Sequence, residues 1–168
     1  MSEPIPETEF AGKLVAGVER IIAAVPYCWL LIRTEEGILS RPMGRILARP
    51  SDDAWTIRFL TDLRSQKVAD IRRSHRATLI FQKEDDEAYA SLGGIVRLIE
   101  TKERVQALWI EKAYSRHFPT DDDRTNAGFI EVEVTRMELW VRGLTPEPFG
   151  VRTTTVTRDS GGRWLCAI

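Results

Sequence analysis

Six segments of strand length follow one another along the chain, each rich in apolar residues and separated from the next by turn residues or a helical stretch. They span residues 27–34, 38–47, 54–60, 77–82, 88–99 and 129–141. Several of the connections are short enough for hairpins, which favours antiparallel pairing. Small antiparallel sheets commonly protect their edge strands by curling on themselves. We therefore predict a mainly β fold, a six-stranded antiparallel barrel that is closed or partly open.

The last two of these segments contain irregularities that predict a β-bulge. In segment 129–141 the inward apolar positions alternate up to Val134 and resume one position out of phase at Met137. One extra residue near Thr135-Arg136 would account for this shift. The Gly93-Gly94 pair in segment 88–99 likewise indicates a bulge or the close approach of another backbone.

Helices are expected between and before the strands, and an extension after them. Apolar residues recur at helical spacing over residues 9–24, 62–73 and 102–116, the last in two pieces, whereas 119–127 is predicted to be an acidic loop. Beyond these elements, residues 151–157 and 164–168 form a plausible hairpin. We assign residues 1–142 to the barrel domain and 143–168 to a C-terminal extension.

Composition limits the class of protein more than it identifies a function. With 168 residues and a net charge of −1, the chain is expected to form one barrel with no general affinity for nucleic acid or anionic membranes. Cys28 and Cys166 form neither a disulfide framework nor a metal-ligand pattern. The N-terminus is acidic and rich in proline, and the longest apolar run, residues 21–32, is too short to span a bilayer. These features predict a cytoplasmic protein.

The strongest signal for a ligand lies at a predicted strand-to-helix turn. Thr61, Ser65 and Lys67 stand where hydroxyl groups, a cation and the free N–H groups of a helix can converge on one phosphate. Arg41, on the preceding strand, offers a planar guanidinium to the same anion. The alternative is a polar turn with an ordinary Thr/Asp helix N-cap.

Several motifs, in this order and spacing, resemble the split-barrel superfamily of pyridoxamine 5′-phosphate oxidases, and its general stress protein 26-like branch in particular. The resemblance covers roughly residues 9–142. The motifs that carry it are residues 37–43, 55–61 with 65–68, 89–94, 108–109 with 117–119, and 138–140.

The resemblance implies a Greek-key split barrel that binds FMN in a cleft between the two subunits of a homodimer. Three sets of residues are implied to bind the cofactor. Arg41, Ser65 and Lys67, with Thr61 beside them, would contact the 5′-phosphate. The backbone of Pro42, Met43, Phe59 and Leu60 would line the ring and the ribityl chain. Tyr89, Trp109 and Trp140 would approach the flavin from the partner subunit.

Two departures from that family bear on the activity. Gln66 stands where the true oxidases often have arginine, and residues 141–146 lack the segment that reads the vitamin B6 substrate. We therefore expect an FMN-binding flavoprotein, an oxidoreductase of unknown substrate with a stress-related role implied by the branch, in which pyridoxamine 5′-phosphate oxidation is negligible. His117 is interpreted as a surface residue on a helix end, and His75 as a helix C-cap.

Three alternatives differ from this expectation in ligand or in activity. The first is a flavin-binding or sensing module without turnover, and the second is a split barrel that binds a deazaflavin or heme. The third is single-stranded nucleic acid binding by the basic segment 58–76. That segment has no aromatic residue after Phe59, whereas such surfaces interleave aromatic rings with positive charge.

Overall fold

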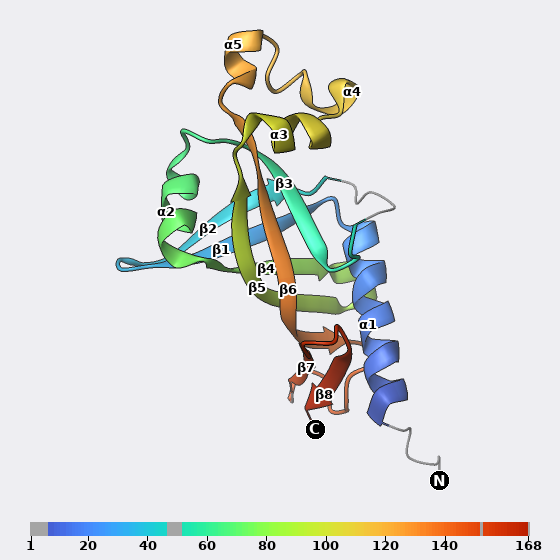
Figure 1. Cartoon of the computed structure of the whole chain (residues 1–168). Helices are drawn as coiled ribbons and strands as arrows, with labels where there is room; N and C mark the ends of the chain where they lie inside the picture. Colours follow the sequence, from blue (N-terminus) through green and yellow to red (C-terminus); the bar gives the residue numbers. More distant parts are fainter. Residues whose placement is uncertain (1–6, 47–51, 152, 168) are drawn as a thin grey trace.

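The computed structural model describes residues 7–46, 52–151 and 153–167, which form a curled sheet with helices at its periphery (Figure 1). The strands are β1 (Tyr27–Thr34), β2 (Gly37–Gly44), β3 (Thr56–Asp62), β4 (Arg76–Lys83), β5 (Ala88–Ile99), β6 (Ala127–Val141), β7 (Thr154–Arg158) and β8 (Trp164–Ala167). The helices are α1 (Glu7–Ala24), α2 (Gln66–Ser74), α3 (Lys102–Leu108), α4 (Glu111–Tyr114) and α5 (Asp121–Arg124), with a 3₁₀ turn at Glu84–Asp86.

The strands form one antiparallel sheet in the order β2-β1-β4-β5-β6-β7-β8, with β3 also paired to β6. Strand β6 is long enough to pair with β5 along one edge and with both β3 and β7 along the other. Beyond β2, the Ile46 N–H donates to the Arg58 carbonyl of β3 at 3.0 Å, so the sheet curls back toward its starting point. The predicted mainly β, partly open barrel is confirmed.

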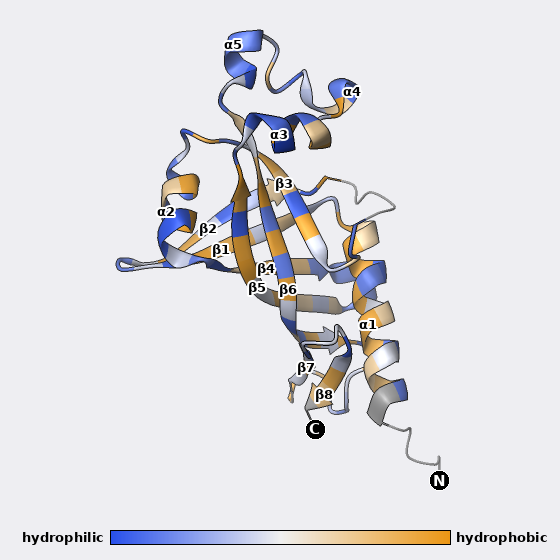
Figure 2. Ribbon diagram, viewed as in Figure 1, coloured by the Kyte–Doolittle hydropathy of each residue, from blue (hydrophilic) through white to orange (hydrophobic). Residues whose placement is uncertain are grey.

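The core lies inside this curl and is capped by α1. Leu14, Val18 and Ile21 of α1 pack in one buried cluster with strand residues such as Leu30 and Leu79. Figure 2 shows apolar and polar segments alternating along the strands, as expected when one face of each strand is buried (Figure 2). Cys28 and Cys166 are both buried and belong to this core.

The predicted bulge is present where β5 and β6 pair. Gly93 lies opposite Arg136 and Gly94 lies opposite Val134, so Thr135 is the extra residue of β6. Gly94 is required there because a Cβ on it would lie 2.2 Å from the carbonyl oxygen of Glu133. The bulge lets β6 keep its apolar face buried on both sides of the irregularity.

Three predicted elements are wrong in detail. The helix expected over 62–73 begins at Gln66, because β3 continues through Asp62 by pairing with Ala127. The predicted acidic loop 119–127 contains α5, which is stabilised by a capping box between Thr120 and Asp123. Of the predicted strand 38–47, residue 47 lies outside the described residues, and the strand ends at Gly44.

Residues beyond 142 form a hairpin that extends the sheet. Strand β7 pairs with β6 from Arg136 to Leu139, and β8 pairs with β7. Strand β8 lies beside α1 (Figure 1), and Val156 and Cys166 belong to the same buried cluster as the α1 residues. The predicted extension therefore contributes to the barrel's own core. No helix among residues 7–46, 52–151 and 153–167 has the length and apolar character needed to cross a membrane.

Candidate functional site

A cleft of about 630 Å³ opens between the ends of β2 and β3, the first turn of α2 and the segment around α4. Five of the predicted site residues line it, namely Pro42, Met43, Leu60, Thr61 and Lys67. Most of the wall is apolar or aromatic, with a few polar groups, which is typical of a small-molecule site.

One end of the cleft is formed by the N-terminus of α2. Ser65 is the N-cap residue, but its side chain makes no capping hydrogen bond, and its buried Oγ has no partner among the described residues. The sequence interpretation placed Thr61 or Asp62 at this position. Thr61 instead lies in β3, where it is buried and lines the cleft. The N-terminus of α2 therefore presents an uncommitted hydroxyl beside the free N–H groups of its first turn.

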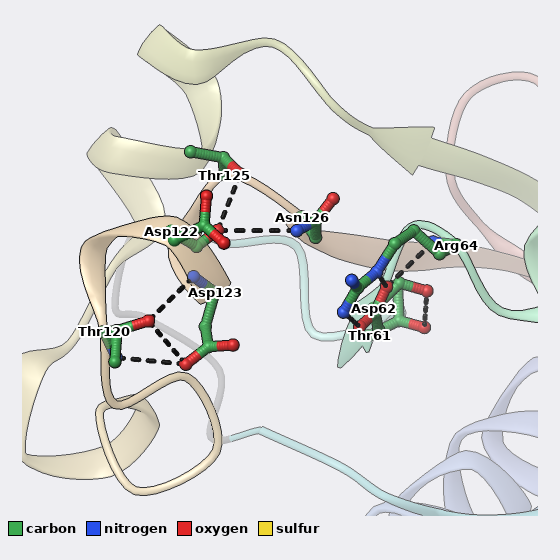
Figure 3. A network of polar contacts seen from close by, with 8 residues as sticks. All are labelled: Thr61, Asp62, Arg64, Thr120, Asp122, Asp123, Thr125 and Asn126. Atoms are coloured by element: carbon green, nitrogen blue, oxygen red, sulfur yellow. Dashed lines mark hydrogen bonds and ion pairs between the residues drawn. The ribbon is translucent and has the colours of Figure 1, made fainter.

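Lys67 supplies positive charge beside this hydroxyl. Burial lowers the pKa of Lys67, an effect that the charge of Asp62 opposes and that of Arg41 reinforces. The Asp62 carboxylate is itself bound by Arg64, through its backbone N–H at 2.8 Å and its guanidinium at 2.7 and 3.0 Å (Figure 3). Lys67 thus makes no ion pair with a carboxylate of the described residues. An anion entering the cleft would stabilise its charged form.

Arg41 lies on the other side of the same helix turn. It lines a second cavity, of about 750 Å³, together with Gln66 and Asp70. It shares this cavity with Gln66, the first residue of α2, and therefore lies beside the helix end that carries Ser65 and Lys67. The side chain of Phe59 is fully buried in the core, so only its backbone is available to the cleft, as was expected for that residue.

The three aromatic residues expected to act from a partner subunit lie outside the lining of the cleft. Tyr89 and Trp140 are register partners across β5 and β6. Trp109 packs edge-to-face on Tyr114 and Phe118, two residues of the cleft wall, at 5.4 and 6.2 Å between ring centroids. Within one chain, Trp109 therefore packs against residues that line the cleft and does not line it itself.

Sequence reasoning missed most of the wall formed by residues 110–118. His117 is exposed, in agreement with its interpretation as a surface residue, and it also lines the cleft, where the Nε–H of Arg116 donates to its Nε2 at 3.0 Å. Arg45 also lines the cleft and donates to the carbonyls of Ala23 and Val25 at the end of α1. The His117-Phe118-Pro119 motif was a sequence signal for this wall, but the motif alone does not indicate where the His117 side chain points.

The residues at the N-terminus of α2 fit a phosphate-bearing ligand. Ser65, whose hydroxyl has no partner among the described residues, and Lys67 lie at the start of α2, and Thr61, whose hydroxyl donates to the Asp62 carbonyl at 3.4 Å, lies near the end of β3. A phosphate accepts hydrogen bonds from hydroxyl and ammonium groups alike. Leu60, Met43 and Pro42 continue the wall with apolar surface, which suits a flat ring.

Comparison with known proteins places this geometry in context. The sequence model of the family described as pyridoxamine 5′-phosphate oxidase like matches residues 14–153. No curated protein sequence matches the chain.

Solved structures with the same fold cover most or all of the chain. One is a pyridoxamine 5′-phosphate oxidase-related, FMN binding protein from Nostoc punctiforme (14% identity, 99% of this chain and 98% of that chain, TM-score 0.68). Another is a Clostridium acetobutylicum protein related to general stress protein 26 of B. subtilis (12% identity, 86% and 94%, TM-score 0.69). A third is PhzG from Burkholderia lata, in complex with tetrahydrophenazine-1-carboxylic acid (15% identity, 99% and 97%, TM-score 0.65).

Proposed function

The chain belongs to the pyridoxamine 5′-phosphate oxidase-like family, and from that premise we propose that it binds FMN in the cleft and acts as an oxidoreductase. The observation that carries the proposal is the buried Ser65 Oγ at the N-terminus of α2, beside Lys67, for which the described part of the chain offers no hydrogen-bond partner. A phosphate would give that hydroxyl an acceptor and Lys67 a counter-charge. The likeness to a solved FMN binding protein supports the same ligand.

Each part of the cleft has a role toward the cofactor. Ser65, Thr61, Lys67 and Arg41 would hold the 5′-phosphate, whereas the segments around Pro42 and Leu60 would line the ring and the ribityl chain. When bound, FMN supplies redox chemistry by accepting and passing on two electrons. The protein contributes binding, ring orientation and exclusion of water, and no side chain has to act as the redox group.

We further propose that two copies form a dimer that completes the cleft. Tyr27 and Trp29 are 66% and 51% exposed on the outer face of β1, and Trp29 is the register partner of Ile80 on β4. Tyr27 lines both the cleft and a hollow of about 550 Å³ next to Trp29, so the apolar surface is continuous with the cleft. A second copy on this surface would bury it and add a wall to the site. Tyr89, Trp109 and Trp140 are the residues we propose to act across that interface.

The proposal also covers the cellular compartment and the substrate. Cys28 and Cys166 are not joined in a disulfide, which is in keeping with the reducing cytoplasm that we propose as the compartment. Residues 141–146 lack the segment with which the true oxidases recognise their vitamin B6 substrate, so we propose a different redox substrate. A role in the stress response is proposed from the likeness to general stress protein 26 relatives.

Flavin titration of the purified protein tests the proposal. FMN is expected to bind more tightly than riboflavin, which lacks the phosphate. Lys67→Gln should weaken FMN binding by about 1.5–3 kcal/mol, as for a lost hydrogen bond to a charged group, and leave riboflavin binding unchanged. Lys13→Gln removes the same charge from the exposed face of α1 and should behave as wild type. Equal affinity for FMN and riboflavin, or uptake of heme or a deazaflavin in place of FMN, would contradict the proposal.

A further inference from the structure

Asp70, in the second turn of α2, is a buried acid whose hydrogen bonds are incomplete. The residue is 5% exposed. Its Oδ1 accepts a hydrogen bond from Gln66 Nε2 at 3.3 Å, whereas Oδ2 has no partner among the described residues. A buried carboxylate oxygen without a partner destabilises a fold, so its presence calls for an explanation outside folding.

The cavity beside Asp70 suggests the explanation. Asp70 lines the second cavity, and so does Arg41, which approaches from β2. Within the described residues Arg41 has no carboxylate partner, and its Nη1 donates only a long hydrogen bond, 3.5 Å, to the carbonyl of Ser40. A buried acceptor without a partner among the described residues and a guanidinium without a carboxylate partner there thus belong to residues that line one cavity, to which Arg33 and Arg73 also contribute.

The position of Arg41 links this cavity to the cleft. Arg41 lines the second cavity together with Gln66, the first residue of α2, and the next residue, Lys67, lines the cleft. A guanidinium has five N–H donors in a planar fork, so it can donate to one anion along one edge and to a second anion along another. Arg41 is thus placed to reach both the N-terminus of α2 and Asp70.

We propose that Asp70 is a positioning residue for Arg41: it accepts a hydrogen bond from the guanidinium and thereby holds Arg41 toward a phosphate bound at the N-terminus of α2. This inference rests on the proposed FMN site and assigns a residue to it that neither the motifs nor the family match names. The bridge also resolves a conflict of charge. Without an intervening cation, the Asp70 carboxylate would repel a phosphate dianion and weaken its binding.

The test measures two quantities, the ratio of FMN to riboflavin affinity and the melting temperature of the protein without flavin. The ratio is informative because Asp70 is proposed to act only on binding of the phosphate, which riboflavin lacks. Asp70→Asn should lower the ratio about 10-fold or more, leave riboflavin affinity unchanged, and keep or raise the melting temperature because a buried charge is removed. Glu19→Gln, an exposed change of equal charge on α1, is the matched control and should change neither quantity.

A double variant shows whether Asp70 acts through Arg41. Asp70→Asn combined with Arg41→Ala should bind FMN as weakly as Arg41→Ala alone, because each change removes the same bridge. Arg41→Lys probes the bridge without altering a buried residue and should also lower the ratio, since an ammonium lacks the planar fork.

Each contrary outcome has a distinct meaning. FMN binding that is unchanged or tighter in Asp70→Asn, a wild-type ratio in Arg41→Lys, or additive losses in the double variant would overturn the inference and leave the FMN site standing. Equal loss of FMN and riboflavin affinity with a lower melting temperature would show a purely structural role and also overturn it. Failure of the wild-type protein to distinguish FMN from riboflavin would overturn the proposed function, and this inference with it.

Discussion

Cys28 lies on the inner face of β1, where burial changes the chemistry of its thiol. The residue is 3% exposed, and desolvation raises its pKa to about 12 despite the nearby charge of Arg45. At pH 8 the reactive thiolate is then a fraction of about 10⁻⁴. We predict that iodoacetamide modifies Cys28 in the native protein at least about 10³-fold more slowly than in guanidinium, as followed by peptide mass spectrometry. Comparable rates in the two conditions would contradict this burial.

The same dependence on burial explains which single residues could be predicted for the site. Lys67 and Ser65 could be proposed from the sequence because residue type and local position at a helix start are enough to indicate an anion site. The burial of Asp70 was not predicted, because an acidic residue on a basic helix is normally exposed to solvent. Only the packing of α2 on the sheet buries it. Arg41 was identified, but the cavity that it lines depends on the register of β1 and β2, which sequence alone does not give.

At the scale of elements, the bulge between β5 and β6 makes a testable distinction between two neighbouring glycines. A Cβ on Gly94 would collide with the backbone of Glu133, whereas one on Gly93 would meet only the carbonyl oxygen of Arg136, at 4.0 Å. We predict that Gly94→Ala destabilises the fold by about 1–3 kcal/mol, the usual range for overpacking. Urea unfolding measures the change.

Gly93→Ala is the matched control for this prediction. Its added methyl group has room, so stability should stay within a few tenths of a kcal/mol of wild type or rise by up to about 1 kcal/mol. Similar losses at the two positions would mean that β5 and β6 do not pair with the register described here.

Local sequence patterns predicted most elements but not all of their ends. The phase shift around Thr135 located the bulge correctly, because one misplaced residue moves every later side chain to the other face. The start of α2 was wrong by four residues, since pairing of Asp62 with Ala127 extends β3, and such a distant partner leaves no trace in the local pattern. The α5 helix did leave one, the capping pair Thr120 and Asp123, which was overlooked in an acidic run.

The whole molecule depends on contacts that join distant parts of the chain. Trp164 of β8 packs edge-to-face on Trp55, 5.1 Å between ring centroids, and Val156 is fully buried in the main cluster. The division between a barrel of residues 1–142 and an extension of 143–168 stays a prediction. It was drawn from the sequence pattern, and alternation within a short hairpin does not reveal what the buried face of that hairpin contacts. The β1–β2 hairpin was accessible for the opposite reason, since antiparallel neighbours along the chain tend to pair, whereas the pairing of β1 with β4 and of β3 with β6 leaves no local signal.

The proposed dimer gives the last prediction at this scale. Trp29→Glu places a charge in the centre of the exposed apolar face of β1, and a charge that must be buried between two copies opposes association. We predict that the variant runs as a monomer in size-exclusion chromatography with light scattering, whereas the wild type runs as a dimer. It should also bind FMN more weakly, because each cleft would lose the wall that the second copy supplies.

A charge at an equally exposed apolar residue elsewhere separates this effect from a general change in solubility. Val151→Glu is suited to this purpose because Val151 is 70% exposed in a turn of the C-terminal segment, outside both the cleft and the β1 surface. It should stay dimeric with unchanged FMN affinity. A wild-type monomer that binds FMN tightly would show that one chain forms the whole site, and Tyr89, Trp109 and Trp140 would then have no role toward the cofactor. A Trp29→Glu protein that stays dimeric would instead move the interface to another face of the barrel.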